Sequence, residues 1–105
     1  MKTVTYKATG IVLGNFWGGG SGSYPARPLN DTTLEGLMKQ ANDGLDGSLD
    51  SGMGYESLIG AMLNITTKTE MMFEDKLFTN KETETVFIGE LTEAQQDFLM
   101  ECSFY

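Results

Sequence analysis

The chain has 105 residues, of which 40% are hydrophobic and none is histidine, and its formal net charge is −8. This length and apolar content predict one folded domain over residues 1–105, because separate cores arise in much longer chains and wholesale disorder accompanies fewer apolar residues. The lack of histidine removes the usual general base, the centre of most catalytic triads and a common metal ligand, so we expect neither enzyme activity nor a cofactor.

The charge is unevenly distributed along the sequence. Residues 1–30 hold three cations and no acid, whereas residues 31–105 hold all fifteen acids and four lysines. A field of this sign repels phosphate, so we do not expect direct nucleic-acid binding. The acids serve either solubility alone or a basic surface of a partner.

Three features predict a cytoplasmic protein with no membrane association. Cys102 is the single cysteine, so no internal disulfide can form. No stretch approaches the roughly 18 apolar residues of a membrane span. The N-terminal sequence lacks the apolar run of a signal peptide.

The first predicted element is a strand over residues 3–16, in which apolar and polar side chains alternate. The stretch NFWGGGSGSYPARPL, residues 15–29, follows. In its second part, Tyr24 and Arg27 each precede a proline and are pushed towards extended geometry. We expect an edge strand or a rim there that lacks two N–H donors.

The first glycine-rich loop does not fit a phosphate-binding loop. It has no glycine at the sixth position of the dinucleotide fingerprint, no GK[ST] motif follows, and the next helix begins about ten residues later. Large aromatic groups flank the glycines, which indicates a loop with anchored ends. Trp17, Tyr24 and Arg27 are residue types that dominate protein interfaces, so the loop either packs structurally or meets a partner.

A helix is predicted to begin near Thr32, where Thr32-x-x-Glu35 fits a capping box, and to end at Gly44 or Gly47. Apolar residues at spacings of three and four then form one stripe that faces a sheet.

The second glycine-rich loop, NDGLDGSLDSGMGYE, partly matches a calcium loop. Asp46, Ser48 and Asp50 occupy positions 1, 3 and 5 of the EF-hand template, but Ser51 and Ser57 stand where glycine and glutamate are needed. An acidic, turn-rich connection is the simpler interpretation. Irregular calcium binding is the alternative.

The remainder of the chain predicts three strands and a helix. A long alternating strand covers residues 61–73, short strands follow at 77–79 and 85–88, and Thr92-x-x-Gln95 caps a C-terminal helix. The fold class is therefore α+β, with a mostly antiparallel sheet of about four strands and two helices in the order β-α-β-β-β-α. We expect both helices on one face of the sheet.

Small size, acidity, absence of histidine and loops such as FWGGGSGSYPAR and DSGMGYESLIGA together resemble small proteins of phages and mobile elements of gut bacteria. Some of these are anti-CRISPR inhibitors that occupy the nucleic-acid-binding surface of a nuclease. The resemblance implies an inhibitor of that kind. No motif assigns a functional residue.

The sequence thus favours a non-enzymatic binding protein that blocks a basic partner surface, such as that of a nuclease. A homo-oligomeric module is the alternative, through an exposed edge strand and the methionines, and a small-ligand or calcium-binding domain is the third. The candidate partner-binding residues combine aromatic anchors, the single arginine and acids near the first helix and second loop: Trp17, Tyr24, Arg27, Glu35, Asp43, Asp46, Asp50, Tyr55 and Glu56.

Overall fold

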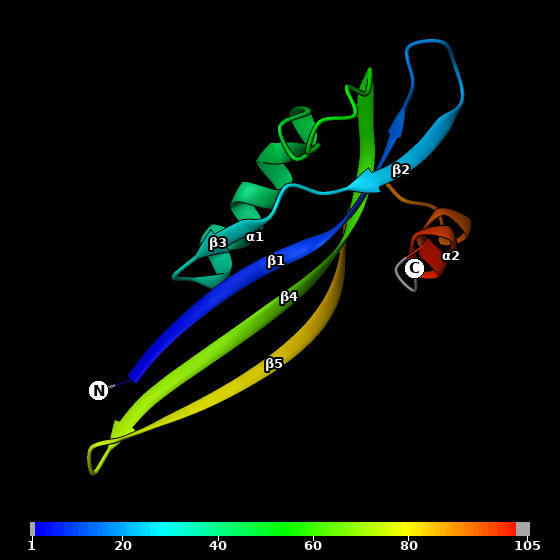
Figure 1. The fold of residues 1–105 in the computed structure, drawn as a ribbon. Helices are drawn as coiled ribbons and strands as arrows, with labels where there is room; N and C mark the ends of the chain where they lie inside the picture. The colour runs from blue at the N-terminus through cyan, green and yellow to red at the C-terminus, as the bar shows by residue number, and fades with distance from the viewer. Residues whose placement is uncertain (1, 103–105) are drawn as a thin grey trace.

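A computed structural model describes residues 2–102. They form one five-stranded antiparallel sheet and two α-helices (Figure 1). In chain order the elements are β1 (Lys2–Asn15), β2 (Ser21–Pro25), β3 (Leu29–Asp31), α1 (Leu34–Asp43), the 3₁₀ turn η1 (Gly44–Asp46), β4 (Ser57–Phe73), β5 (Lys76–Gly89) and α2 (Glu93–Cys102).

Two long strands, β1 and β4, form the middle of the sheet. They pair along their length, and β5 continues the ladder on the other side of β4. Both short strands pair with the free edge of β1: β2 lies beside residues 11–15 and β3 beside residues 6–8. The path across the sheet is β2-β1-β4-β5, so β5 is an outer strand.

The predicted α+β class, the antiparallel sheet and the two helices are confirmed, while the element order is β-β-β-α-β-β-α. The segment expected as an edge strand or rim divides into β2 and β3. The stretches predicted as separate strands at 77–79 and 85–88 belong to the single strand β5. The polar residues between them remain extended because β4 supplies a continuous ladder partner.

The helices lie on opposite faces of the sheet, so the expectation of one shared face is wrong (Figure 1). On the α1 side, Leu37 packs with Ala8 and Ile65. On the α2 side, Leu99 packs with Leu13 and Met62. Strand residues of opposite parity therefore enter two separate cores.

The helix starts follow local capping chemistry. Thr33, one residue later than predicted, caps α1: its hydroxyl accepts a hydrogen bond from the Gly36 amide at 3.0 Å. For α2 the predicted capping box is confirmed, since the Gln95 side chain accepts from the Thr92 amide at 2.8 Å and the Gln95 amide donates to the Thr92 hydroxyl at 3.2 Å.

The molecule is elongated, with principal extents of 59 × 24 × 20 Å. The β4–β5 hairpin runs far beyond both helices, together with the start of β1 (Figure 1). We call residues 2–9 and 66–84 the ribbon half, and residues 10–65 and 85–102 the helical half. Near the hairpin turn the ribbon half exposes large apolar side chains: Met71, Met72, Phe73, Leu77 and Phe78.

Candidate functional site

The two glycine-rich loops meet at the end of the helical half. The indole Nε1 of Trp17 donates a hydrogen bond to the carbonyl oxygen of Gly54 at 3.1 Å. Next to it, the Phe16 and Tyr55 rings pack with centroids 5.1 Å apart at an interplanar angle of 31°. The aromatic residues thus anchor the first loop on the second, while Trp17 remains 75% exposed.

Backbone contacts strengthen this junction. The Arg27 amide donates to the Leu49 carbonyl at 2.7 Å, and the Glu56 amide donates to the Asn15 carbonyl at 2.9 Å. The Ser51 hydroxyl donates to the Pro25 carbonyl at 2.6 Å. Segments far apart in the sequence are therefore fixed to each other, which a mobile glycine–serine linker would not achieve.

Asp50 organises the second loop from within. Its carboxylate accepts hydrogen bonds from the backbone amides of the four residues 52–55, at 2.8–3.3 Å. Partial burial raises the pKa of Asp50, but these four amides outweigh that effect and leave the pKa below its ordinary value. Amide donors occupy the oxygens that a cation would need, which argues against the calcium alternative at this residue.

Tyr55 lies under the loops with its hydroxyl oxygen buried. Among residues 2–102 this hydroxyl has no hydrogen-bond partner. Burial raises the pKa of Tyr55, and the nearby Asp50 and Tyr24 raise it further. The Tyr55 ring therefore supports Phe16 through apolar contact. Its buried hydroxyl adds no hydrogen bond within residues 2–102.

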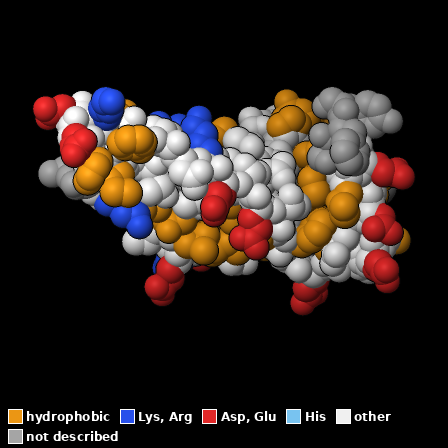
Figure 2. Space-filling model, turned by 90° about the horizontal axis from the view of Figure 1, so that it is seen from below, with side chains coloured by type: hydrophobic (Ala, Val, Ile, Leu, Met, Phe, Trp, Pro, Cys, Tyr) orange, Lys and Arg blue, Asp and Glu red, His pale blue; other side chains and the backbone are white. Residues whose placement is uncertain are grey.

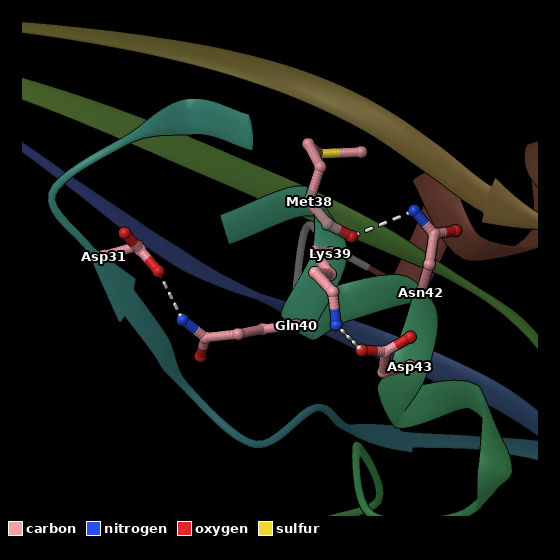
Figure 3. Close-up of polar contacts among 6 residues, drawn as sticks. All are labelled: Asp31, Met38, Lys39, Gln40, Asn42 and Asp43. Carbon is pink, nitrogen blue, oxygen red and sulfur yellow. Dashed lines mark hydrogen bonds and ion pairs between the residues drawn. The ribbon is translucent and has the colours of Figure 1, made fainter. Parts of the chain in front are cut away.

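Arg27, Asp43 and Asp46 line one pocket of about 310 Å³ at the C-terminal end of α1. Asp46 accepts hydrogen bonds from the Ser48 amide and hydroxyl, both at 3.0 Å, and these lower the pKa of Asp46. Asp43 forms an ion pair with Lys39 at 2.9 Å (Figure 3). The predicted arginine and two of the predicted acids thus share a site.

The same helix is fastened to the sheet edge by Gln40. Its amide nitrogen donates to the Asp31 carboxylate at 2.7 Å (Figure 3) and to the Asn30 carbonyl at 3.1 Å. Hydrogen bonds from the Thr33 amide, together with Gln40, lower the pKa of Asp31. These contacts hold α1 against β3 and so fix the position of the Arg27 pocket.

The remaining predicted residues are more dispersed. Glu35 lies in the first turn of α1, away from the loops. Glu56 is exposed just before β4, beside the loop junction. Tyr24 lies on β2 opposite Val12 and contributes to a pocket of about 420 Å³ that also contains Cys102. The structure therefore gathers the loop residues and the Arg27 pocket, but not Glu35.

Charge is divided sharply between the two halves of the molecule. The ribbon half holds five lysines and five acids, whereas the helical half holds two cations and ten acids. Figure 2 shows the visible basic side chains, lysine or arginine, confined to one part of this face and only acidic charges over the other. The whole net charge of −8 therefore belongs to the helical half.

Two groups of charged residues were not predicted from the sequence. Glu93, Asp97 and Glu101 recur every four residues and so line one side of α2. On the sheet, the strand registers place Lys7, Lys68 and Lys81 on a common face. Helical spacing was a usable signal for the first group. The second depends on strand register, which the sequence alone did not provide.

The comparisons with known proteins returned no match, whether to family models, to curated proteins or to solved structures. Within residues 2–102 no three His, Cys, Asp or Glu side chains gather in a geometry suited to a metal ion. The two described helices are too short and too polar to cross a membrane.

Proposed function

We propose that this chain is a non-enzymatic binding protein whose acidic helical half covers a basic surface of a partner protein. One observation carries the proposal: the helical half bears ten acids against Arg27 and Lys39, while the ribbon half is electrically balanced. Such a concentrated field speeds association with a positively charged surface and selects against acidic ones.

The loop junction supplies an anchor for such a contact. The hydrogen bond of its ring nitrogen and the adjoining Phe16–Tyr55 pair hold Trp17 in place. Its exposed ring is therefore fixed in position before a partner binds. A pre-positioned tryptophan loses little conformational entropy on binding and is a residue type often found at interface hot spots. Carboxylates around it would face lysines and arginines of the partner.

The partner that best fits this chemistry is a protein that binds nucleic acid, such as a nuclease. Its groove is basic because it neutralises phosphates, and a surface rich in carboxylates competes for the same cations. Occlusion of that groove needs no catalytic residue in the inhibitor, in agreement with the anti-CRISPR-like inhibitor suggested by the sequence.

Immobilised protein incubated with host lysate tests this proposal. The expected partner is retained at low ionic strength, is released as salt rises, and is displaced by duplex DNA, because DNA and the acidic half compete for one surface. A variant with Asp43 and Asp46 changed to lysine is expected to retain less of it.

The matched control changes Glu82 and Glu84 to lysine, which alters the net charge equally but in the ribbon half. This control is expected to retain the partner as the unchanged protein does. Retention that is insensitive both to salt and to DNA would contradict the proposal.

A further inference from the structure

The α2 side of the ribbon half is an uncovered sheet face that carries positive charge. Register places Thr5, Lys68 and Lys81 in one row across the three strands, and Lys7, Thr66 and Thr83 in the next. A hydrogen bond between the Thr66 and Thr83 hydroxyls, at 3.3 Å, joins side chains of this face. We call Lys7, Lys68 and Lys81 with these threonines the lysine face.

The lysine face is on the same side of the sheet as α2. In the helical half, Leu13 and Met62 point towards α2, and Lys7 and Lys68 have the same parity on their strands. Glu70 shares the face and lies 3.4 Å from Lys68, so three lysines meet a single acid there. Within residues 2–102, α2 covers only the part of this side that lies in the helical half.

The outer surface of α2 has the opposite charge. Leu99 points into the sheet, and Glu93, Asp97 and Glu101 occupy the opposite side of the helix. Among residues 2–102 the ion pairs join Lys39 to Asp43 and Lys68 to Glu70, so these three carboxylates have no ion-pair partner in that part of the chain. Like charges four residues apart destabilise an isolated helix, and nearby cations relieve that effect.

From this arrangement we infer that a second copy of the chain covers the lysine face, in a two-fold dimer. The α2 sides of two copies face each other with their long axes reversed, so α2 of each copy lies on the lysine face of the other. Each of Glu93, Asp97 and Glu101 then meets a lysine-bearing surface. The contact is isologous, since one surface contains both complementary parts.

The dimensions suit this packing. A ten-residue helix is about 15 Å long, and the ten residues of β4 from 64 to 73 extend about 30 Å. The two copies of α2 would fill one layer between the two sheets, each resting on its own sheet and on the partner's ribbon. Phe98, which is 44% exposed on α2, and the exposed Met72 and Leu77 at the far end of this face add apolar contact area.

A second copy explains the observations better than an anionic ligand does. A phosphate or polyanion would neutralise the lysine face but leave the α2 carboxylates Glu93, Asp97 and Glu101 without a cation. The dimer satisfies both surfaces at once. It also leaves the Trp17 loops at its two outer ends, so the tryptophan remains free to contact the proposed partner.

Sedimentation equilibrium of the full chain tests the dimer, from about 1 to 500 µM, which covers the dissociation constants of weak dimers. Variant A changes Lys7, Lys68 and Lys81 to glutamate, and variant B changes Glu93, Asp97 and Glu101 to lysine. Each alone is expected to weaken the dimer by at least about 100-fold, because like charges now face each other. Mixed together, A and B are expected to form a heterodimer, since both contacts are then attractive.

Matched controls carry the same charge changes on the other side of the sheet or on α1. Lys2, Lys39 and Lys76 changed to glutamate match variant A, and Glu35, Asp43 and Asp46 changed to lysine match variant B. Both controls are expected to remain dimeric, and circular dichroism and thermal melting verify that every variant is folded. A monomeric wild type, a dimer that persists in A or B, or a mixture that stays monomeric overturns the inference.

Discussion

The indole nitrogen of Trp17 donates a hydrogen bond to the carbonyl oxygen of Gly54, so the exposed tryptophan of the first glycine-rich loop is fastened to the second. The contact spans 37 residues of sequence. It turns two segments that are individually rich in glycine into one constrained surface. Fastening leaves the ring face open, which is the arrangement expected of a contact residue rather than of a core residue.

Replacing Trp17 with alanine should therefore separate binding from folding. We expect a loss of about 1 kcal/mol or less in the free energy of unfolding, since one partly exposed hydrogen bond disappears, and a much larger loss of partner retention. Urea denaturation and lysate retention measure the two effects. Leu34→Ala, at another exposed apolar position, is the control; equal effects of both substitutions on retention would contradict a special role of Trp17.

Asp50 is predicted to stabilise the protein through its four backbone hydrogen bonds. Asp50→Asn should lower the free energy of unfolding at neutral pH by about 1–3 kcal/mol, because a charged acceptor of several amides is lost. Glu84→Gln, at an exposed position of β5, should stay within about 0.5 kcal/mol of the wild type. Chemical denaturation of the three proteins provides the comparison.

The same residue gives a pH dependence with a definite sign. The pKa of Asp50 in the folded chain lies below the ordinary 3.8, so its stabilising effect is complete above that value and is lost as pH falls through the folded pKa. The difference in stability between wild type and Asp50→Asn should therefore shrink in strongly acidic solution. A difference that is constant from neutral to acidic pH would refute this role.

Tyr55 should behave in the opposite way at alkaline pH. The pKa of Tyr55 in the folded chain is raised above the ordinary 10.0. The stability that the protonated ring gives to the fold is therefore fully present below pH 10, and it is lost as pH rises through the folded pKa. Tyr55→Phe removes this loss and also removes a buried hydroxyl without a partner in the described chain. We expect unchanged or higher stability at neutral pH and a smaller decline above pH 10, measured by thermal melting across that range.

Gly14 and Gly18 provide a matched pair of glycine substitutions. A Cβ at Gly14 would lie 2.6 Å from Cγ of the Tyr55 ring, whereas a Cβ at Gly18 would meet nothing within 4 Å. Gly14→Ala should cost about 1–3 kcal/mol of stability through overpacking, and Gly18→Ala should be close to neutral. Similar melting temperatures for the two variants would show that the Tyr55 ring does not constrain β1.

The sequence predicted those elements whose local chemistry decides their structure. The capping box at Thr92 and Gln95 was sufficient to place the start of α2, because both of its hydrogen bonds are local. At α1 the two adjacent threonines offered two possible caps. Asp31 accepts hydrogen bonds from the amide and hydroxyl of Thr33, and Thr33 is the one that caps the helix.

The sequence does contain a sign that the helices lie on opposite faces of the sheet, but the prediction did not use it. Residues 11–13, 61–63 and 86–88 are apolar at consecutive positions, which indicates strands buried on both faces. Alternation elsewhere in the same strands suggested one buried face. Likewise, the lysine face combines Lys7, Lys68 and Lys81 from three strands, and only the register across the sheet brings them together.

The outer position of β5 has a consequence for how copies of this chain meet. An open strand of fourteen residues invites another edge to add to it. Yet two such edges aligned antiparallel about Glu82 would place Glu82 against Glu82, and alignment about Lys81 or Glu84 would again oppose like charges. The charges in the middle of β5 thus disfavour these three registers of edge-to-edge addition, while the sheet's broad surface stays free for a closed and finite assembly.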